Sequence, residues 1–272
     1  MARPRVVLKL GGELLEQPSD LDTVARGIAA LAGRASLVVV HGGGREIDAA
    51  LAAAGIAKRQ VDGLRITDRP TLDVVVSVLA GAINTRLVAA VRRSGARPVG
   101  LTGADAAVVT VRKSPPIRTV AGARVDLGLV GSPVANGAPA LLTDLLARGY
   151  VPIVACIGAT KRGDLLNVNA DTLASRLAAD LGARRLVIAG GTPGVLDGAG
   201  RTIPRLTSAA AARLIREGTA NKGMVAKLDA CRAAVRQGVG DVLIADGRTV
   251  PFGSLASSGT TVDFERCTQV VR

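Results

Sequence analysis

Aromatic residues are nearly absent from this sequence. Phe, Tyr and Trp make up 1% of its 272 residues, whereas hydrophobic residues of all kinds make up 48%. The core must therefore be built from Val, Leu, Ile and Ala, which suits the aliphatic strands of a parallel sheet covered on both faces. The chain is long enough for one large α/β domain or for two lobes.

Cysteine is scarce as well. Cys156, Cys231 and Cys267 are far apart, odd in number and free of any CxxC spacing. This pattern argues against a disulfide framework and against a zinc site, so we expect buried thiols and no metal held by protein ligands. The first apolar run ends at Lys9 and is too short for a signal peptide or a membrane span. We predict a cytoplasmic protein without membrane contact.

The chain has few acidic residues for its number of basic ones. Its formal charge is +13 and its pI is about 11.0. The basic residues are dispersed, however, and the longest runs are pairs, such as Arg92-Arg93 and Arg184-Arg185. Without a basic tail or aromatic stacking platforms, nucleic-acid binding is not expected. A positive field is compatible with a nucleotide and an acidic metabolite as substrates.

Strand-like and helix-like runs alternate along most of the chain, which indicates a parallel sheet with helices on both faces. We therefore predict an α/β three-layer sandwich with a mostly parallel central sheet. A middle region, 106–133, reads as β-hairpins at a sheet edge, and a weak boundary at Gly182 divides lobes 1–181 and 182–272. Strands are expected at 6–10, 37–40, 97–101, 151–156, 165–168, 186–189 and 241–245, and helices at 21–31, 46–54, 71–93, 138–148, 171–181, 208–216 and 225–236.

Glycine-rich turns follow the first two expected strands. They read Lys9-Leu10-Gly11-Gly12 and His41-Gly42-Gly43-Gly44. Glycine lets a phosphate approach backbone N–H groups, and the helix after the second turn aims its N-terminus at an anion. Neither a dinucleotide-binding GxGxxG nor a P-loop is present. His41 has no nucleophile-elbow partner, and we interpret it as structural.

Two further polar segments precede expected helices. One is Asn167-Val168-Asn169-Ala170-Asp171, which has more amide and carboxylate groups than a helix cap requires. The other is Asn221-Lys222-Gly223-Met224, which leads to Lys227. Taken singly, each is explained by capping or by a solvated lysine.

Together with Gly63-Leu64-Arg65-Ile66-Thr67 and Pro193-Gly194-Val195, these segments resemble the amino-acid kinase superfamily and, within it, the acetylglutamate kinases. The six motifs occur in order from Val6 to about Gly247. The resemblance implies an enzyme that uses ATP to phosphorylate the side-chain carboxylate of N-acetyl-L-glutamate, giving N-acetyl-L-glutamyl 5-phosphate for arginine biosynthesis.

The resemblance also implies roles for individual residues. Lys9 and Lys227 would flank the transferring phosphoryl group, and Asp171 would hold both lysines. Gly12 and Gly44 would donate backbone N–H groups to the phosphoryl oxygens. The remaining implied contacts form two sets: Gly43, Gly44, Arg65 and Asn167 for N-acetylglutamate, and Gly191, Thr192, Pro193, Gly194, Val195, Leu196, Thr219, Ala220 and Asn221 for ATP, with Mg²⁺ carried in by the nucleotide.

Departures from the family pattern concern the nucleotide side. Gly190-Gly191 stands where Thr/Ser-Asp is usual, and Lys222 stands where a small or acidic residue is common. Both changes are expected to weaken ATP binding or to alter nucleotide preference, unless backbone groups of Gly191 and Thr192 substitute. Arginine-inhibited relatives carry an additional N-terminal helix, and only eight residues precede Lys9, so the resemblance implies a homodimer joined through 71–93.

Alternative activities within the same fold stay open. A carrier-protein-linked aminoadipate or glutamate kinase is one, although such relatives tend to show Asn-Thr-Asp-Gly-Asp at 167–171. Uridylate, aspartate, carbamate and glutamate 5-kinases match the motif set less well. A different possibility is a catalytically weak homologue that only binds metabolites. The presence of Lys9, Asp171 and Lys227 together argues against it.

Overall fold

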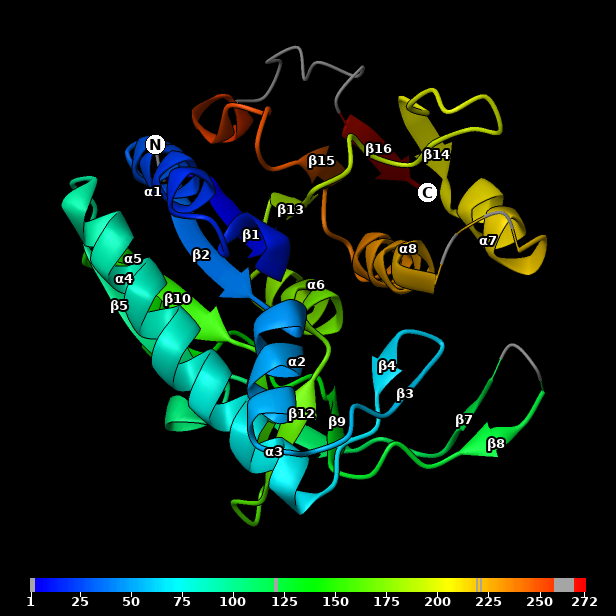
Figure 1. The fold of residues 1–272 in the computed structure, drawn as a ribbon. Helices are drawn as coiled ribbons and strands as arrows, with labels where there is room; N and C mark the ends of the chain where they lie inside the picture. Colours follow the sequence, from blue (N-terminus) through cyan, green and yellow to red (C-terminus); the bar gives the residue numbers. More distant parts are fainter. Residues whose placement is uncertain (1–2, 120–121, 219, 221, 257–266) are drawn as a thin grey trace.

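An eight-stranded sheet runs through the molecule (Figure 1). The computed structural model describes all residues except 1–2, 120–121, 219, 221 and 257–266. The strand order is β14-β16-β15-β13-β1-β2-β10-β5, and every pairing is parallel except that of β15 with β16. The bounds are β1 Arg5–Leu10, β2 Ser36–His41, β5 Pro98–Thr102, β10 Val151–Ala155, β13 Arg185–Gly190, β14 Arg205–Thr207, β15 Asp241–Asp246 and β16 Cys267–Val271.

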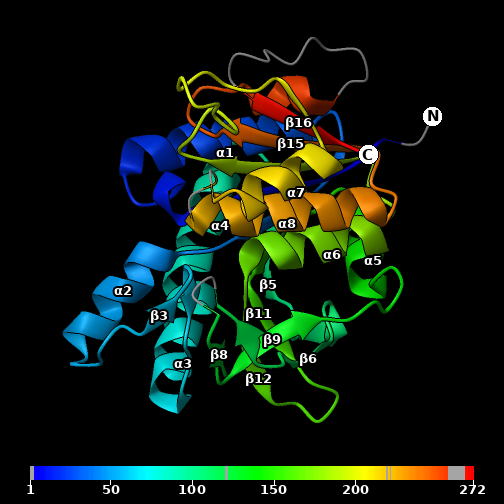
Figure 2. The same cartoon turned by 90° about the vertical axis from the view of Figure 1, so that its right-hand side faces the viewer.

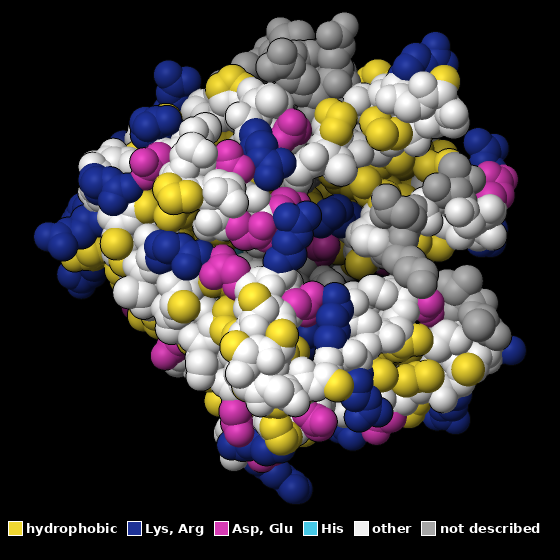
Figure 3. Space-filling view, in the orientation of Figure 1, with side chains coloured by type: hydrophobic (Ala, Val, Ile, Leu, Met, Phe, Trp, Pro, Cys, Tyr) yellow, Lys and Arg dark blue, Asp and Glu magenta, His cyan; other side chains and the backbone are white. Residues whose placement is uncertain are grey.

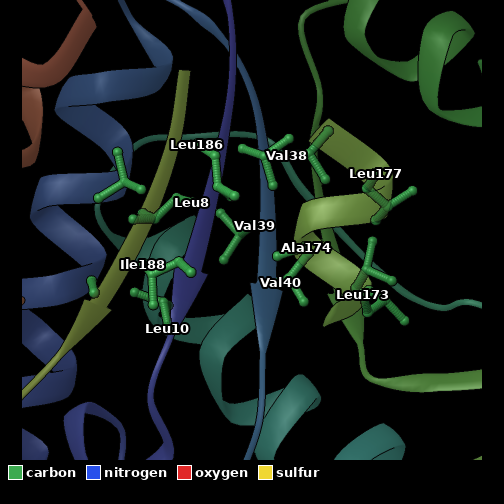
Figure 4. Packing of buried hydrophobic residues seen from close by; sticks show 14 of the residues in the cluster. Leu8, Leu10, Val38, Val39, Val40, Leu173, Ala174, Leu177, Leu186 and Ile188 are labelled. Carbon is green, nitrogen blue, oxygen red and sulfur yellow. The ribbon is translucent and has the colours of Figure 1, made fainter. Parts of the chain in front are cut away.

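Helices cover both faces of this sheet, which confirms the predicted three-layer α/β architecture. On one face lie α1 (Pro18–Ala32) and α4 (Asn84–Arg93), and the other face, turned to the viewer in Figure 2, carries α5 (Ala140–Ala147), α6 (Ala170–Asp180) and α8 (Lys222–Arg236). Leu173, Ala174 and Leu177 of α6 lie against Val38 and Val40 of β2 (Figure 4). Aliphatic burial of this kind contributes about 1.5–3 kcal/mol for each fully buried side chain. Two more helices are α2 (Gly44–Ala53) and α7 (Ser208–Arg216), which contacts α8.

The long helix predicted at 71–93 is present but not uniform. It comprises α3 (Arg69–Val76), a π-helical segment (Ser77–Ile83) and α4. Among the described residues this is the one stretch long and apolar enough to cross a membrane, with 25 residues, a mean hydropathy of 1.9 and 39% of its apolar window buried. Its contacts with α1, β5 and β10 make it one layer of the fold.

The middle region forms antiparallel pairs, as predicted, but apart from the main sheet. Val111–Lys113 (β6) pairs with Val130–Pro133 (β9) in a separate four-stranded sheet of order β11-β12-β9-β6, and Ile117–Arg118 (β7) pairs with Arg124–Val125 (β8). The first strand of the region begins only at Val111, because Ala106 and Ala107 take left-handed φ values of 47° and 54° and turn the chain. The strands of this sheet and of two small hairpins are β6 Val111–Lys113, β9 Val130–Pro133, β11 Ile157–Ala159, β12 Leu165–Val168, β3 Gln60–Val61, β4 Leu64–Arg65, β7 Ile117–Arg118 and β8 Arg124–Val125.

The segment after Gly182 supplies half of the main sheet. It contributes β13, β15, β16 and β14, and β13 pairs directly with β1. One sheet therefore continues across the predicted boundary at 181/182. The division into two lobes stays a prediction. The end of the chain has a clear structural place, since β16 lies between β14 and β15.

Candidate active site

The glycine turns and a lysine meet at one edge of the main sheet. Lys9 lies near the end of β1, with Val40 and Ile188 beside it in the register. Because β1, β2 and β13 are parallel, the turns that follow them emerge at the same edge, where ligands of open α/β sheets bind. The face drawn in Figure 3 is hollowed near its middle, with charged side chains of both signs around the hollow.

Three side chains distant in sequence converge beyond this edge. Lys9 Nζ lies 2.8 Å from Oδ1 of Asp171 as an ion pair, and Lys227 Nζ donates to Oδ2 of the same carboxylate at 3.3 Å. The Lys9 and Asp171 side chains are 6% and 7% exposed, and that of Lys227 is 18% exposed. β1, the first turn of α6 and α8 each supply one of the three groups.

The charged groups of this cluster shift one another's pKa values. Burial would raise the pKa of the Asp171 carboxyl, but the two neighbouring ammonium groups outweigh it and lower that pKa. Burial alone would lower the pKa of Lys9, yet Asp171 raises it. For Lys227, burial and the charge of Lys9 lower the pKa. Two buried cations share the carboxylate of Asp171, and the nearby carboxylate of Glu13 attracts both of them. Ammonium groups gathered in this way suit an anionic ligand.

The two glycine turns pack directly against each other. A Cβ on Gly12 would lie 2.8 Å from Gly43 Cα and 3.2 Å from the Gly44 nitrogen, so a side chain there would push the turns apart. A Cβ on Gly43 would lie 2.1 Å from Ile83 Cδ1. Helix α2 begins at Gly44, and the first N–H groups of a helix have no intrahelical partner. These glycines therefore present backbone donors beside Lys9.

A cavity of about 200 Å³ opens on one side of the cluster, lined by Gly42, Gly43, Gly44, Ile47, Gln60, Gly63, Leu64, Arg65, Leu79, Val130, Cys156, Asn167, Val168, Asn169 and Ala170. Arg65 Nη2 bonds to Asp48 and to the Gly44 carbonyl, at 3.3 Å for the latter. Its Nη1 is buried and has no hydrogen-bond partner among the described residues. An arginine fixed by one nitrogen with another free is suited to binding a carboxylate.

The two asparagines before Asp171 have different hydrogen-bond partners. Asn169 caps α6, since its Oδ1 accepts from the Thr172 nitrogen at 3.0 Å. Asn167 lines the cavity and donates from Nδ2 to Thr67 Oγ1 at 3.2 Å. Both asparagines therefore line the cavity, and Asn169 in addition caps a helix.

A second cavity, of about 110 Å³, lies in the C-terminal segment. Thr192, Gly194, Val195, Leu196 and Ala220 were predicted to contact nucleotide and line it, whereas Gly191 and Pro193 do not. Leu214 and Met224 also line it and were missed, because an aliphatic residue on a helix gives no binding signal. Thr219 and Asn221 lie outside the described residues. Met224 is one turn before Lys227 on α8, so this helix connects the cavity to the charged cluster.

The turn that lines the second cavity is fixed by strand β16. Thr268 is fully buried, and its Oγ1 accepts from the Val195 nitrogen at 2.8 Å and donates to the Ile203 carbonyl at 2.7 Å. Gly194 has a φ of 123°, and a Cβ there would lie 2.5 Å from this hydroxyl oxygen. The chain end, for which the sequence predicted no role, thus supports this turn.

His41 is a structural residue of the glycine turn. It is fully buried, and its Nε2 accepts from the Asn84 amide at 3.0 Å. Burial, with a smaller effect of Arg86, lowers the pKa of the imidazole to about 4. His41 is therefore neutral at physiological pH and reaches no cluster of acidic groups.

Two residues of the site were missed from the sequence. Glu13, directly after Gly12, accepts through Oε1 from the Gly191 nitrogen at 3.0 Å. Arg248 donates to the Glu13 carbonyl at 3.1 Å and to Asp20 at 2.8 Å. Nothing in the residues around Arg248 indicates these contacts, whereas an acidic residue beside a phosphate-binding turn is a charge conflict visible in the sequence. The Gly191 nitrogen, considered a substitute nucleotide contact, is already bonded within the protein.

The Mg²⁺ that the resemblance implies would arrive with the nucleotide, so its fit depends on the carboxylates near the cluster. In the described part of the chain no three acidic, His or Cys side chains gather in a group able to hold a metal ion. Mg²⁺ keeps several waters and needs only one or two carboxylates besides nucleotide phosphates. A single carboxylate beside the cluster, that of Glu13, fits this demand.

Comparisons with known proteins agree with the geometry. Residues 4–246 match the model of the "Amino acid kinase family". The acetylglutamate kinase of Solibacter usitatus is 42% identical over 244 residues, covering 89% of this chain and 91% of the relative, and that of Sorangium cellulosum is 44% identical over 260 residues, covering 92% and 89%.

Solved structures extend this likeness to the fold. The N-acetylglutamate synthase from Neisseria gonorrhoeae, complexed with coenzyme A and N-acetyl-glutamate, superposes with a TM-score of 0.82 at 25% identity, and the match spans 100% of this chain but 60% of that one. The Giardia carbamate kinase superposes over the whole of both chains with a TM-score of 0.70 at 14% identity.

Proposed function

Because the chain belongs to the amino acid kinase family, we propose that it transfers the γ-phosphoryl group of ATP to the side-chain carboxylate of N-acetyl-L-glutamate. The product is N-acetyl-L-glutamyl 5-phosphate, an intermediate of arginine biosynthesis. Relatives that share 42% and 44% of their residues with this chain over about nine-tenths of its length are acetylglutamate kinases.

One observation supports the assignment to these residues. Lys9, Asp171 and Lys227 form a buried ion-paired cluster, and residues close to them in the chain line two cavities, one lined by Arg65 and one lined mainly by apolar side chains. Asn169 and Ala170 of the first cavity directly precede Asp171, and Met224 of the second lies on the same helix as Lys227. A donor and an acceptor bound in these cavities would approach each other at the two lysines.

The chemistry demands little beyond charge and position. The acceptor carboxylate is ionised at neutral pH, so no general base is required. Phosphoryl transfer depends on alignment and on neutralising the charge of the equatorial oxygens. Lys9, Lys227 and the N–H groups of Gly12 and Gly44 would stabilise that charge, and Asp171 would keep both ammonium groups in place.

The substrates are assigned to the cavities by chemistry. Arg65, Asn167, Gly43 and Gly44 would bind the α-carboxylate and acetamido groups of N-acetylglutamate. The cavity of Thr192, Val195, Leu196 and Ala220 would take the adenine end of ATP, with Thr219 and Asn221 proposed as further contacts. Mg²⁺ would supply charge neutralisation of the phosphates when bound with ATP.

A hydroxamate assay tests the assignment directly. Purified protein, ATP, Mg²⁺ and free N-acetyl-L-glutamate should give acyl hydroxamate when hydroxylamine traps the acyl phosphate. Product only with a carrier-protein-linked aminoadipate or glutamate would favour the carrier-dependent alternative. Absence of product with either substrate, despite nucleotide binding, would identify a metabolite-binding homologue instead.

We also propose an oligomeric state and a cellular location. We infer a homodimer joined through the half-exposed apolar face of the helix at Arg69–Arg93, on which Val74, Val78 and Val88 are only partly buried. A mass of two chains by light scattering is expected, and Val78→Asp should reduce it to one. A cytoplasmic location stays the prediction made from the sequence.

A further inference from the structure

Glu13 occupies a place in the site that neither the motifs nor the proposed mechanism assigns. It lies in the turn after β1 and extends its carboxylate across to the turn after β13, where Oε1 accepts from the Gly191 nitrogen at 3.0 Å. The residue is half-buried, and Arg248 fixes its backbone by donating to its carbonyl oxygen. Its side chain is therefore held rather than free in solvent.

Two glycines make room for this carboxylate. A Cβ on Gly11 would lie 2.4 Å from Glu13 Oε2, and a Cβ on Gly190 would lie 3.1 Å from Oε1. A Cβ on Gly191 would lie 2.9 Å from Arg248 Nη1 and, at 3.5 Å, only in ordinary contact with Glu13 Cγ. Gly11 and Gly190 therefore fit the Glu13 carboxylate as much as they fit a phosphate.

The carboxylate attracts both cations but lies too far away to pair with either. Both ammonium groups pair with Asp171, and no ion pair joins either of them to Glu13 in the described part of the chain. The virtual Cβ of Gly190 lies between Glu13 Oε1, at 3.1 Å, and Lys227 Cε, at 4.0 Å, so the carboxylate and the lysine flank one small space. A phosphate chain bound at the lysines would lie next to a negative charge.

We propose that Glu13 makes the phosphate site selective for metal-complexed nucleotide over free nucleotide. The inference rests on the proposed function, because it assumes that ATP phosphates bind at Lys9 and Lys227. A fixed carboxylate repels the bare polyphosphate. When Mg²⁺ is present, the same carboxylate faces a cation that accepts carboxylate oxygen or its bridging water. Glu13 is thus a specificity residue of the site rather than a group that reacts.

Calorimetric titration with a non-hydrolysable ATP analogue tests this without turnover. The wild type should bind the analogue at least about tenfold more tightly in excess Mg²⁺ than in EDTA, as expected for one charge contact near a surface. In Glu13→Gln the ratio should fall toward one, mainly because the free analogue binds more tightly. The glutamine keeps an oxygen that accepts from Gly191, so the turn retains its anchor.

Glu217→Gln is the matched control, since it removes the same charge from an exposed position at the end of α7 and should keep the wild-type ratio. An unchanged ratio in Glu13→Gln, or a wild type that binds both forms equally, overturns the inference and leaves the proposed function intact. A wild type that binds neither form overturns both. Equal melting temperatures of the variants exclude misfolding as the cause.

Discussion

At the residue scale, Lys9 and Lys227 share the carboxylate of Asp171 but differ in how deeply they are buried. Lys9 is more deeply buried, and Lys227 approaches from α8 with 18% of its side chain exposed. We expect Lys227→Ala to lower kcat by about 10² or more, the usual effect of losing a contact that strengthens in the transition state. The KM for N-acetylglutamate should change little.

Steady-state kinetics with both substrates varied would check this. Lys161→Ala removes an exposed lysine from a surface turn and should leave kcat unchanged. A kcat of Lys227→Ala equal to that of the wild type would remove Lys227 from the mechanism.

The Arg65 side chain lines the first cavity, so its loss should affect the other substrate. Arg65→Ala should raise the KM for N-acetylglutamate by about 10- to 10²-fold, since a charge-assisted contact is worth about 1.5–3 kcal/mol, while Asp48 keeps Lys58 as its partner. The KM for ATP should stay near the wild-type value. Arg69→Ala, at an exposed i,i+4 pair with Asp73, is the control. A rise in the KM for ATP instead would reverse the assignment of the two cavities.

At the element scale, β16 positions a turn that it does not belong to. Replacing Thr268 by Val keeps the shape but removes the hydroxyl, leaving the Val195 N–H and the Ile203 carbonyl unpaired. We expect a loss of about 1–3 kcal/mol in the free energy of unfolding. The KM for ATP should rise severalfold while that for N-acetylglutamate is unchanged. Thr268→Ser retains the hydroxyl and should resemble the wild type; an unaltered KM for ATP in Thr268→Val would argue that the turn needs no such support.

At the scale of the whole molecule, His41 links stability to pH. Its pKa is about 4 in the folded protein and about 6.5 in the unfolded chain, so the unfolded state binds the proton more readily. The stabilisation is fully present above pH 6.5 and is lost as the pH falls toward 4. Between pH 7.5 and 5 this group alone should cost about 2 kcal/mol.

Urea unfolding of the wild type and of His41→Gln at both pH values isolates the effect, because His41 is the only histidine. The wild type should lose more stability than the variant, and equal losses would contradict the prediction. If the variant does not fold, the single imidazole signal in the NMR spectrum of the wild type should titrate near pH 4.

The sequence predicted most of the architecture, because aliphatic runs bounded by glycine mark buried parallel strands. β12 and α7 were placed to the residue. The strands β14 and β16 were missed, since three residues of Arg-Leu-Thr and a polar tail have no strand-like run; their pairing is decided by tertiary contacts. The π-helical segment before Asn84 was missed for a different reason. The spacing of apolar residues cannot distinguish a regular helix of 3.6 residues per turn from one with a local insertion.

For the site, motif order predicted the residues that the structure brings together at Lys9, Asp171 and Lys227, and their roles stay predictions. The residues that support this cluster could not be predicted from the sequence. Glu13 and Gly191 are 178 positions apart, and Arg248 is 235 positions from Glu13. Contacts over such separations follow from the folded chain and leave no local pattern in the sequence.

The position of β16 inside the sheet has a consequence for how the protein is made. While the chain is emerging from the ribosome, β14 has no strand to pair with, and the turn at Val195 has no hydroxyl anchor until residue 271 has been synthesised. The segment after Gly182 must therefore wait, with an open strand edge, for its last strand. Nascent chains that stall before this point would expose that edge and would be the species most dependent on chaperones.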